Sequence, residues 1–293
     1  MQGRIYKGGK EFKHGLQSSG IEMMVTRDSK NRRGALSELG HRFREAWQDA
    51  ATVPVPRDSI PANRKEAYVV QDAFAEGLEG EMAGWKVGAT SPRMRELDGH
   101  EDIILGRLFK STTWRGSSCE IPMDLFPNSK IEAEFGFELL RDIDAEGEFP
   151  DDGVLRESLR LRPSIEIIGL RHEPPQNEPA SVRSLLVLAD NGAGCGCIAG
   201  EPVEDWRGLD LKNLAVGLSI DGGEEADNFL GEFRADPVEV VADLVGHLRG
   251  RGCSLKKGDI VLTGAAAVPQ PIRKGSKVRV EYPGIGMLEF NCV

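Results

Sequence analysis

From Gly84 onward, the sequence consists of short apolar or β-branched runs separated by Gly, Pro and Asp. The runs are GWKVGAT, IEAEFGFELL, SIEIIGL, SLLVLADN, LAVGLSI, DIVLTGA and SKVRVEY. Runs of this length with turn residues between them are typical of β-strands. They do not alternate with helices, which disfavours a doubly wound parallel sheet. We therefore predict a β-rich sandwich or roll, interrupted by one helix from about Pro237 to Arg249 with Asp236 as its N-cap.

The residues before this region have helical patterns instead. Apolar residues recur at three- and four-residue spacing in residues 35–50, namely Leu36, Leu39, Phe43 and Trp47. This spacing is typical of a helix with one buried face. A proline-rich connection follows, and a second helix is predicted from about Asn63 to Leu78.

Three parts are expected along the chain. Residues 1–33 are polar and glycine-rich without a sustained period, and we expect a loosely ordered N-terminal arm there. Residues 34–83 are expected to form a helical N-terminal portion, and residues 84–293 a β-rich catalytic domain.

Charge and composition exclude several classes of protein. The net charge is −10 over 293 residues, so no nucleic-acid or anionic-membrane partner is expected. No apolar run approaches the ~18 residues that a membrane span needs, and the first residues lack the apolar core of a secretory signal. Five cysteines are too few for a disulfide framework in a chain of this size, and we expect reduced thiols. These features predict a cytoplasmic protein.

Three glutamates lie in runs where a strand would otherwise be apolar: Glu132 and Glu134 in IEAEFGFEL, and Glu166 in SIEIIGLR. Residues i and i+2 of a strand point to the same face, so Glu132 and Glu134 should project side by side. With Glu166 on a neighbouring strand, three oxygen ligands would select Mg²⁺ or Mn²⁺ rather than Zn²⁺. The same spacing also fits the wet face of a half-exposed strand, so the residues alone leave both interpretations open.

Lys86 is a further candidate, because it lies between Trp85 and Val87 in a short apolar run. A desolvated ammonium there would have a lowered pKa and could exchange protons, although a lysine at a strand edge fits the same pattern. Asp190 and Asn191 precede a glycine turn, where such residues usually cap the turn.

Thr263 and Gly264 end a predicted strand, where backbone N–H groups could approach an anion such as a substrate carboxylate. An ordinary strand exit would look the same. The five histidines are scattered and share no motif, so each is expected to be a surface or structural residue and a histidine-based triad has little support.

Taken in order, GWKVGATSP, IEAEFGFEL, SIEIIGLR, LADNGAG and the C-terminal GDIVLTG…PQPIRKGSKVRVEYPGIGMLEF resemble a known family. It is the 2-keto-4-pentenoate hydratase and 2-oxo-3-enedioate decarboxylase branch of the fumarylacetoacetate hydrolase superfamily. EAYVVQDAF, with Tyr68 and Gln71, also resembles that branch. The resemblance covers roughly residues 35 to 290.

The resemblance implies an α+β fold, a mixed β-roll with a small helical N-terminal portion. It implies that Glu132, Glu134 and Glu166 bind Mg²⁺ or Mn²⁺ and that Lys86 is the active-site lysine. The expected substrate-binding residues are Phe135, Asp190, Asn191, Thr263 and Gly264. It further implies a small-molecule 2-oxo acid substrate, which chelates the metal through its carboxylate and C2 oxygen, and assembly as a homo-oligomer.

The implied reaction is hydration of a 2-hydroxy-2,4-dienoate to a 4-hydroxy-2-oxo acid through a metal-stabilised enolate, with Lys86 as the proton carrier. Decarboxylation of a 2-oxo-3-enedioate is the first alternative. An acylpyruvate-type C–C bond hydrolase is the second, although His41 and Glu45 do not lie in the sequence setting that such enzymes use. A non-catalytic relative that binds 2-oxo acids is the third.

One position departs from the pattern of the branch. Its hydratases usually carry an acidic residue shortly before a glycine downstream of the lysine, and the corresponding residue here is Ile104 in GHEDIILGRLF. Glu101 and Asp102 are close in sequence, but a shift of two residues in an extended segment moves a side chain by ~6–7 Å. The metal-binding half of the mechanism is therefore expected to be intact, while the group that delivers the proton is not identified. This departure favours decarboxylation or a related enolate reaction more than the motifs alone do.

Overall fold

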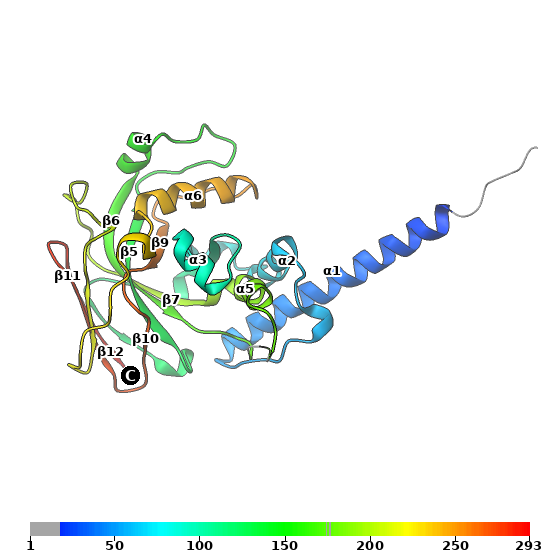
Figure 1. The fold of residues 1–293 in the computed structure, drawn as a ribbon, viewed down its shortest axis with the longest axis horizontal. Helices are drawn as coiled ribbons and strands as arrows, with labels where there is room; N and C mark the ends of the chain where they lie inside the picture. Colours follow the sequence, from blue (N-terminus) through cyan, green and yellow to red (C-terminus); the bar gives the residue numbers. More distant parts are fainter. Residues whose placement is uncertain (1–17, 174, 176) are drawn as a thin grey trace, which may run out of the picture.

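The computed structural model describes residues 18–173, 175 and 177–293, and it contains two β-sheets with helices packed around them (Figure 1). The larger sheet has eight strands in the order β2-β1-β9-β5-β6-β7-β3, with β10 paired to β5. Its strands are β1 (Met82–Gly88), β2 (Ile104–Phe109), β3 (Thr113–Arg115), β5 (Lys130–Leu139), β6 (Leu159–Ile168), β7 (Gly194–Ala199), β9 (Ile260–Ala265) and β10 (Gln270–Pro271).

The smaller sheet has the order β4-β12-β11-β8. Its strands are β4 (Ser118–Ile121), β8 (Gly217–Ile220), β11 (Lys277–Tyr282) and β12 (Gly286–Cys292).

Both sheets are mixed. In the larger one, β1 runs parallel to β9 and antiparallel to β2, while β5 is antiparallel to both β6 and β9. The inner faces of the two sheets share one core, in which Phe135 of β5 packs edge-on against Tyr282 of β11 with ring centroids 5.8 Å apart. The predicted α+β class with a mixed, curled sheet is confirmed.

The helices are α1 (Ser18–Gln48), α2 (Arg64–Ala75), α3 (Pro92–Asp98), α4 (Asp152–Glu157), α5 (Ala180–Ala189) and α6 (Pro237–Arg249). Short 3₁₀ turns are η1 (Arg57–Ser59), η2 (Glu79–Glu81), η3 (Lys110–Thr112), η4 (Met123–Leu125), η5 (Asn191–Ala193) and η6 (Gly231–Phe233). The predicted N-cap of α6 is present, because Asp236 accepts from Val238 N. At the start of α2, Asn63 accepts from Glu66 N.

A second apolar cluster joins α1, α2 and α5 to the edge of the larger sheet. It contains Leu36, Leu39, Phe43, Val70, Phe74, Phe109 and Leu188. Gln71 of α2 is fully buried in it, and its Nε2 donates to Leu105 O at 2.8 Å and to Leu188 O at 2.7 Å. This side chain therefore connects α2 to both β2 and α5.

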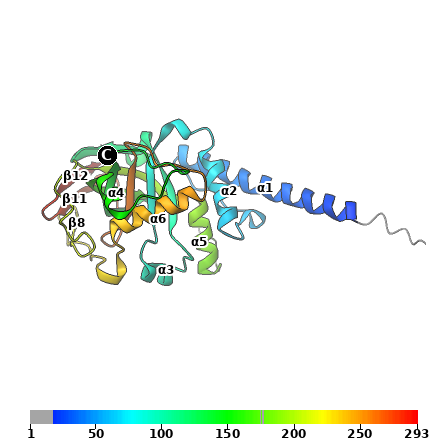
Figure 2. The same cartoon turned by 90° about the horizontal axis from the view of Figure 1, so that it is seen from above.

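The structure differs from the sequence predictions at two helices. Residues 18–33, expected in a loosely ordered arm, belong to α1, whose first half projects away from the rest of the molecule (Figures 1 and 2). Within this segment, Arg32 Nε donates to Glu66 Oε1 of α2 at 3.2 Å, and residues 1–17 lie outside the described residues. SLLVLADN, predicted as a strand, forms most of helix α5. A short apolar run fits either element, and here packing against α2 favours a helix. The division into three parts remains a prediction.

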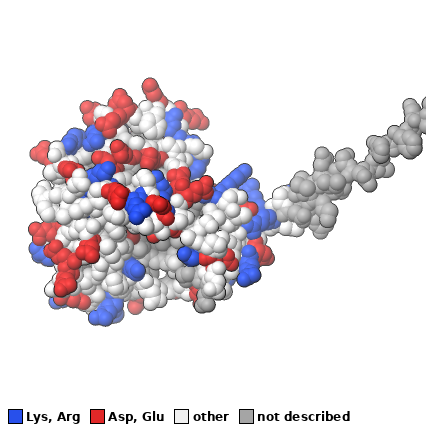
Figure 3. Space-filling model, in the orientation of Figure 1, with Lys and Arg blue, Asp and Glu red and all other residues white. Residues whose placement is uncertain are grey.

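Acidic and basic side chains are interspersed over the face that Figure 3 shows, with no continuous basic surface among its described residues. Within the described part of the chain, no helix combines the length and apolar character that crossing a membrane requires.

The close approach of β1 to β9 predicts a strong stability effect at Gly84. Its φ is +144°, and a Cβ there would lie 1.9 Å from Ile260 O. We expect Gly84→Ala to lower the free energy of unfolding by roughly 2–4 kcal/mol in a urea titration, because the paired backbones must separate. Gly80→Ala is the matched control, since a Cβ at Gly80 meets nothing within 4 Å. Equal stability of the two variants would contradict this account of the pairing.

Candidate active site

The register of β5 and β6 brings the three predicted glutamates together. Glu132 lies directly opposite Glu166 across the antiparallel pair, and Glu134 follows two residues later on the same face of β5. One carboxylate oxygen from each lies within 4.8 Å of the others. Glu134 and Glu166 are completely buried, and Glu132 is half-buried at the wall of a cavity. This burial excludes the interpretation in which the three glutamates lie on the solvent-exposed face of a strand.

The buried oxygens of this cluster have few protein partners. Gly264 N donates to Glu134 Oε2 at 2.7 Å. Glu134 Oε1 and both Glu166 oxygens accept no hydrogen bond from the described residues. Buried carboxylates without hydrogen bonds cost free energy unless a counter-charge is present. Three converging carboxylates with free oxygens fit a hard divalent cation such as Mg²⁺.

Burial raises the pKa values of carboxylates in this cluster when no cation is bound. The pKa of Glu134 is raised well above its usual value, first by burial and then by repulsion from Glu166 and Glu132. Burial also raises the pKa of Glu166 to about 7, although the ammonium of Lys86 opposes the shift. A cation among these oxygens would compete with the protons, so the site is expected to bind metal more tightly as the pH rises.

Lys86 on β1 lies beside the cluster and is 4% exposed. Its Nζ donates to Gly192 O at 2.8 Å and lies 3.4 Å from Glu166 Oε1. Burial alone would lower its pKa, as we predicted, but attraction to Glu166, Glu132 and Glu134 outweighs burial and the pKa is raised. The predicted lowering is therefore wrong for the metal-free site, because the sequence did not reveal how close the carboxylates lie.

Glycines make room for this lysine. A Cβ at Gly106 would lie 2.9 Å from Lys86 Cδ, and a Cβ at Gly192 or Gly194 would come within 3.3 Å of the same side chain. Gly192 also has a φ of +63°, which a larger residue rarely adopts. The tight turn from Gly192 to Gly194 thus both accommodates Lys86 and supplies the carbonyl that binds it.

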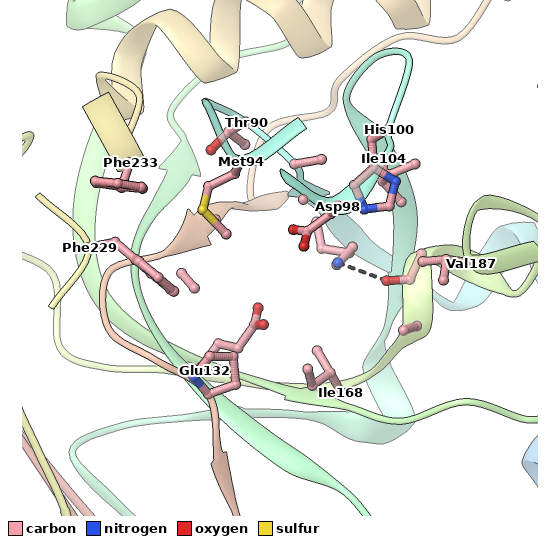
Figure 4. Close-up of a pocket in the computed structure, with 18 residues that line it drawn as sticks. Thr90, Met94, Asp98, His100, Ile104, Glu132, Ile168, Val187, Phe229 and Phe233 are labelled. Atoms are coloured by element: carbon pink, nitrogen blue, oxygen red, sulfur yellow. Dashed lines mark hydrogen bonds between the residues drawn. The ribbon is translucent and has the colours of Figure 1, made fainter. Parts of the chain in front are cut away.

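A cavity of about 380 Å³ opens from this cluster. Glu132 and Ile168 lie on one side of it and Thr90, Met94, Asp98 and His100 on the other, with Phe229 and Phe233 at one end and Val187 at the opposite end (Figure 4). Lys86, Ile104 and Gly264 also line it. The cavity therefore combines Glu132 and Lys86 with polar side chains across from Glu132 and with apolar side chains at its two ends.

The five predicted substrate-binding residues do not all line the cavity. Gly264 lines the cavity, whereas Thr263 is buried and its Oγ1 donates to Phe135 O at 2.6 Å. The Phe135 ring packs in the core between the sheets. Neither the Thr263 nor the Phe135 side chain is part of the cavity wall.

Asp190 and Asn191 are also buried, and their side chains bind protein groups. Asp190 accepts from the backbone N and the guanidinium of Arg171 and lies 2.8 Å from His172 Nδ1. Asn191 exchanges two hydrogen bonds with the backbone of Arg107. Both residues therefore shape the turn that carries Gly192, instead of facing the cavity.

The sequence analysis missed Met94, Asp98, Phe229 and Phe233, and it placed His100 among the surface or structural histidines. Asp98 and His100 lie between Lys86 and Ile104, and this proximity in sequence was the available signal. Phe229 precedes the 3₁₀ turn η6 and Phe233 ends it, and no regular sequence pattern marked either residue. His41, considered for a hydrolase, contacts Glu76 at 3.0 Å and does not line the cavity.

No family profile matches the chain. Curated relatives include a 2-keto-4-pentenoate hydratase of Paraburkholderia xenovorans (strain LB400), 26% identical over 253 residues that cover 85% of this chain and 91% of the relative. A 4-oxalocrotonate decarboxylase of Pseudomonas sp is 25% identical over 261 residues, or 87% and 97% of the two chains. A 2-oxo-hept-4-ene-1,7-dioate hydratase of Escherichia coli is 28% identical over 236 residues, or 78% and 86%.

The solved structure of 4-oxalocrotonate decarboxylase from Pseudomonas putida G7, complexed with magnesium and adipate, superposes with a TM-score of 0.76. The match has 23% identity and covers 89% of this chain and 98% of that one. The chain resembles the hydratase and decarboxylase branch of the fumarylacetoacetate hydrolase superfamily. The relatives confirm the resemblance that the motifs indicated, and the fold is like that of the decarboxylase structure.

Glu134 offers a direct test of the metal site. We expect Glu134→Gln to weaken Mg²⁺ or Mn²⁺ binding by at least about 10-fold in calorimetry, because it removes one of three charged ligands. Folding should be retained, since the amide matches the carboxylate in size. Glu281→Gln, on the exposed face of β11, is the control and should bind like the unchanged protein. Unaltered affinity in Glu134→Gln would exclude this cluster as the metal site.

The pKa of Glu166 predicts a pH effect on the metal-free protein. Its folded value of about 7 exceeds the usual 4.5, so its contribution to stability is full below pH 4.5 and is lost as the pH rises to 7. In EDTA, Glu166→Gln should reduce this decline of the unfolding free energy by on the order of 1–3 kcal/mol. Urea titrations between pH 4.5 and 8 measure it. A decline as steep as that of Glu281→Gln would contradict the shifted pKa.

Proposed function

We propose that this protein is a metal-dependent lyase that hydrates a 2-hydroxy-2,4-dienoate to a 4-hydroxy-2-oxo acid. The observation that carries the proposal is the convergence of three carboxylates and Lys86 at one wall of a largely apolar cavity. The hydratase names of several relatives support it. The cavity of about 380 Å³ is large enough for a short dienoate.

Glu132, Glu134 and Glu166 would hold the cation. When bound, Mg²⁺ or Mn²⁺ supplies a Lewis acid for the C2 oxygen of the substrate and offsets the charge of the three carboxylates. Gly264 lies next to this wall, and its N–H, by binding Glu134, fixes the orientation of one ligand. The apolar side chains Met94, Phe229 and Phe233 would surround the hydrocarbon tail and exclude bulk water.

Lys86 would hold a proton at Nζ close to the substrate head. Its hydrogen bond to Gly192 O fixes the ammonium near Glu166. With the carboxylate charges offset, burial would dominate and lower the pKa of Lys86 toward the range useful for proton transfer. Protein groups on this wall would thus stabilise and protonate the oxygen end of the substrate.

Decarboxylation of a 2-oxo-3-enedioate is the second candidate. Ile104 at the cavity wall favours it, because no acid occupies the position that hydratases of this branch use. The fold likeness to a 4-oxalocrotonate decarboxylase is compatible with either reaction. Assembly as a homo-oligomer and a cytoplasmic location remain predictions.

Three assays separate the reactions. With Mg²⁺ and 2-hydroxypenta-2,4-dienoate, we expect the dienol absorbance to disappear and a 4-hydroxy-2-oxo acid to form. Release of CO₂ from a 2-oxo-3-enedioate would instead identify the decarboxylase. Cleavage of an acylpyruvate would identify a hydrolase, and inactivity in all three assays with bound metal would favour a 2-oxo acid-binding protein.

Lys86→Met tests the proton carrier. We expect kcat on the dienoate to fall by about 100-fold or more, because the variant keeps the volume of the side chain but removes its proton. Metal affinity should persist, as measured by calorimetry. Lys277→Met, at an exposed position of β11, should leave kcat unchanged. Full activity of Lys86→Met would remove Lys86 from the mechanism.

A further inference from the structure

Ile104 leaves part of the cavity without a group that transfers protons. It is 2% exposed, and its Cγ2 would lie 3.3 Å from a Cβ at Gly192, close to Lys86. Its hydrocarbon side chain cannot exchange a proton. Lys86 Nζ already donates to Gly192 O and lies 3.4 Å from Glu166 Oε1, beside the proposed metal ligands. Water addition to the substrate tail therefore requires another titratable side chain.

His100 lines the same cavity, on the side that faces Glu132 (Figure 4). It follows Gly99, whose left-handed conformation ends α3 and turns the chain back toward the cavity. His100 Nδ1 lies 2.7 Å from Ser184 Oγ on α5, and Ser184 is 6% exposed. Its Nε2 has no hydrogen bond to another described residue. The ring is thus held by one nitrogen and leaves the other for a ligand.

Burial favours the neutral form of His100. It is the main cause of the lowered pKa of His100; Asp98 opposes it, and Lys86 and Arg64 lower the pKa further. Arg183 and His172 line an adjacent hollow that shares Asp98 and His100 with the cavity wall. With hydrogen on Nδ1, donated to Ser184 Oγ, Nε2 is a proton acceptor at neutral pH.

We propose that His100, oriented by Ser184, is the catalytic base for water addition to the substrate tail, in place of the acid that Ile104 lacks. This inference rests on the proposed hydratase function. Lys86 first moves a proton from the C2 hydroxyl to C5 of the dienol, which gives a 2-oxo-3-enoate with a C3=C4 double bond. His100 Nε2 then takes a proton from water while the water oxygen bonds to C4, and the C3–C4 π electrons move toward the C2 oxygen. The proton on His100 is then delivered to C3, which restores the neutral ring and the C2 ketone. The net change is the addition of one water.

The test compares variants on the dienoate with saturating Mg²⁺. We expect His100→Gln to lower kcat by about 10²–10³-fold, with KM and Mg²⁺ affinity within about 3-fold of the unchanged protein. The fall of kcat at acidic pH, which reports the protonation of His100, should disappear from the pH profile; this fall is called the acidic limb. His41→Gln is the matched control and should retain both kcat and the limb.

Two further variants test the arrangement around the ring. Ser184→Ala should lower kcat less, by about 10-fold, and shift the acidic limb because Nδ1 loses its partner. Adding Ile104→Asp to His100→Gln should restore part of the lost kcat. In the metal-free protein, NMR titration of the ring should give a pKa below 6.5 that Ser184→Ala changes.

The outcomes distinguish this inference from the proposed function. If the unchanged protein hydrates the dienoate and His100→Gln keeps its kcat and acidic limb, His100 is not the base and the hydratase function stands. If Asp98→Asn loses the acidic limb while His100→Gln keeps its kcat and its limb, the base is Asp98 and the inference is overturned. If the unchanged protein lacks hydratase activity, both the proposed function and this role of His100 fall.

Discussion

The burial of three carboxylates beside one ammonium is the interaction on which the site depends. Glu134 and Glu166 are completely enclosed, and their free oxygens converge with Glu132 without enough protein donors to satisfy them. A sheet interior that carries this much negative charge requires a counter-charge. Lys86 provides one, and a divalent cation would provide the rest. The likeness to a structure solved with magnesium is a likeness of fold, whereas the unsatisfied oxygens are a property of this chain.

The surrounding backbone is shaped by the need to keep Lys86 close to those carboxylates. Glycines at 106, 192 and 194 leave space for its methylene groups, and Gly192 O accepts a hydrogen bond from its Nζ. The Arg171–Asp190 ion pair and the bonds between Asn191 and Arg107 hold the turn that presents this carbonyl. Asp190 and Asn191 thus affect the site through the backbone. Their substitution would alter the position of Lys86 even though neither side chain faces the cavity.

The cavity wall opposite Glu132 is the part of the site in which this chain departs from the pattern of the branch. The hydrocarbon side chain of Ile104 and the imidazole of His100 lie on the same side, and α5 supplies Ser184 to orient the ring. A proton-transfer group can be moved between neighbouring positions, provided that it still reaches the same region of the substrate. The proposed cation site has no such freedom, since three carboxylates would have to meet at one point.

The sequence by itself predicted the cluster of carboxylates that the structure brings together. Glu132 and Glu134 share a face because side chains alternate along a strand, and the order of the motifs identified Glu166 and Lys86. It also determined the α+β class and the N-cap of α6, which depend on local patterns. It could not determine whether SLLVLADN is a strand or a helix, because a short apolar run fits both and only contact with α2 decides. The pKa of Lys86 and the position of His100 were likewise decided by the tertiary structure. Both depend on distances between β1, α3, α5 and the β5–β6 pair, and these distances exist only after the sheet has closed.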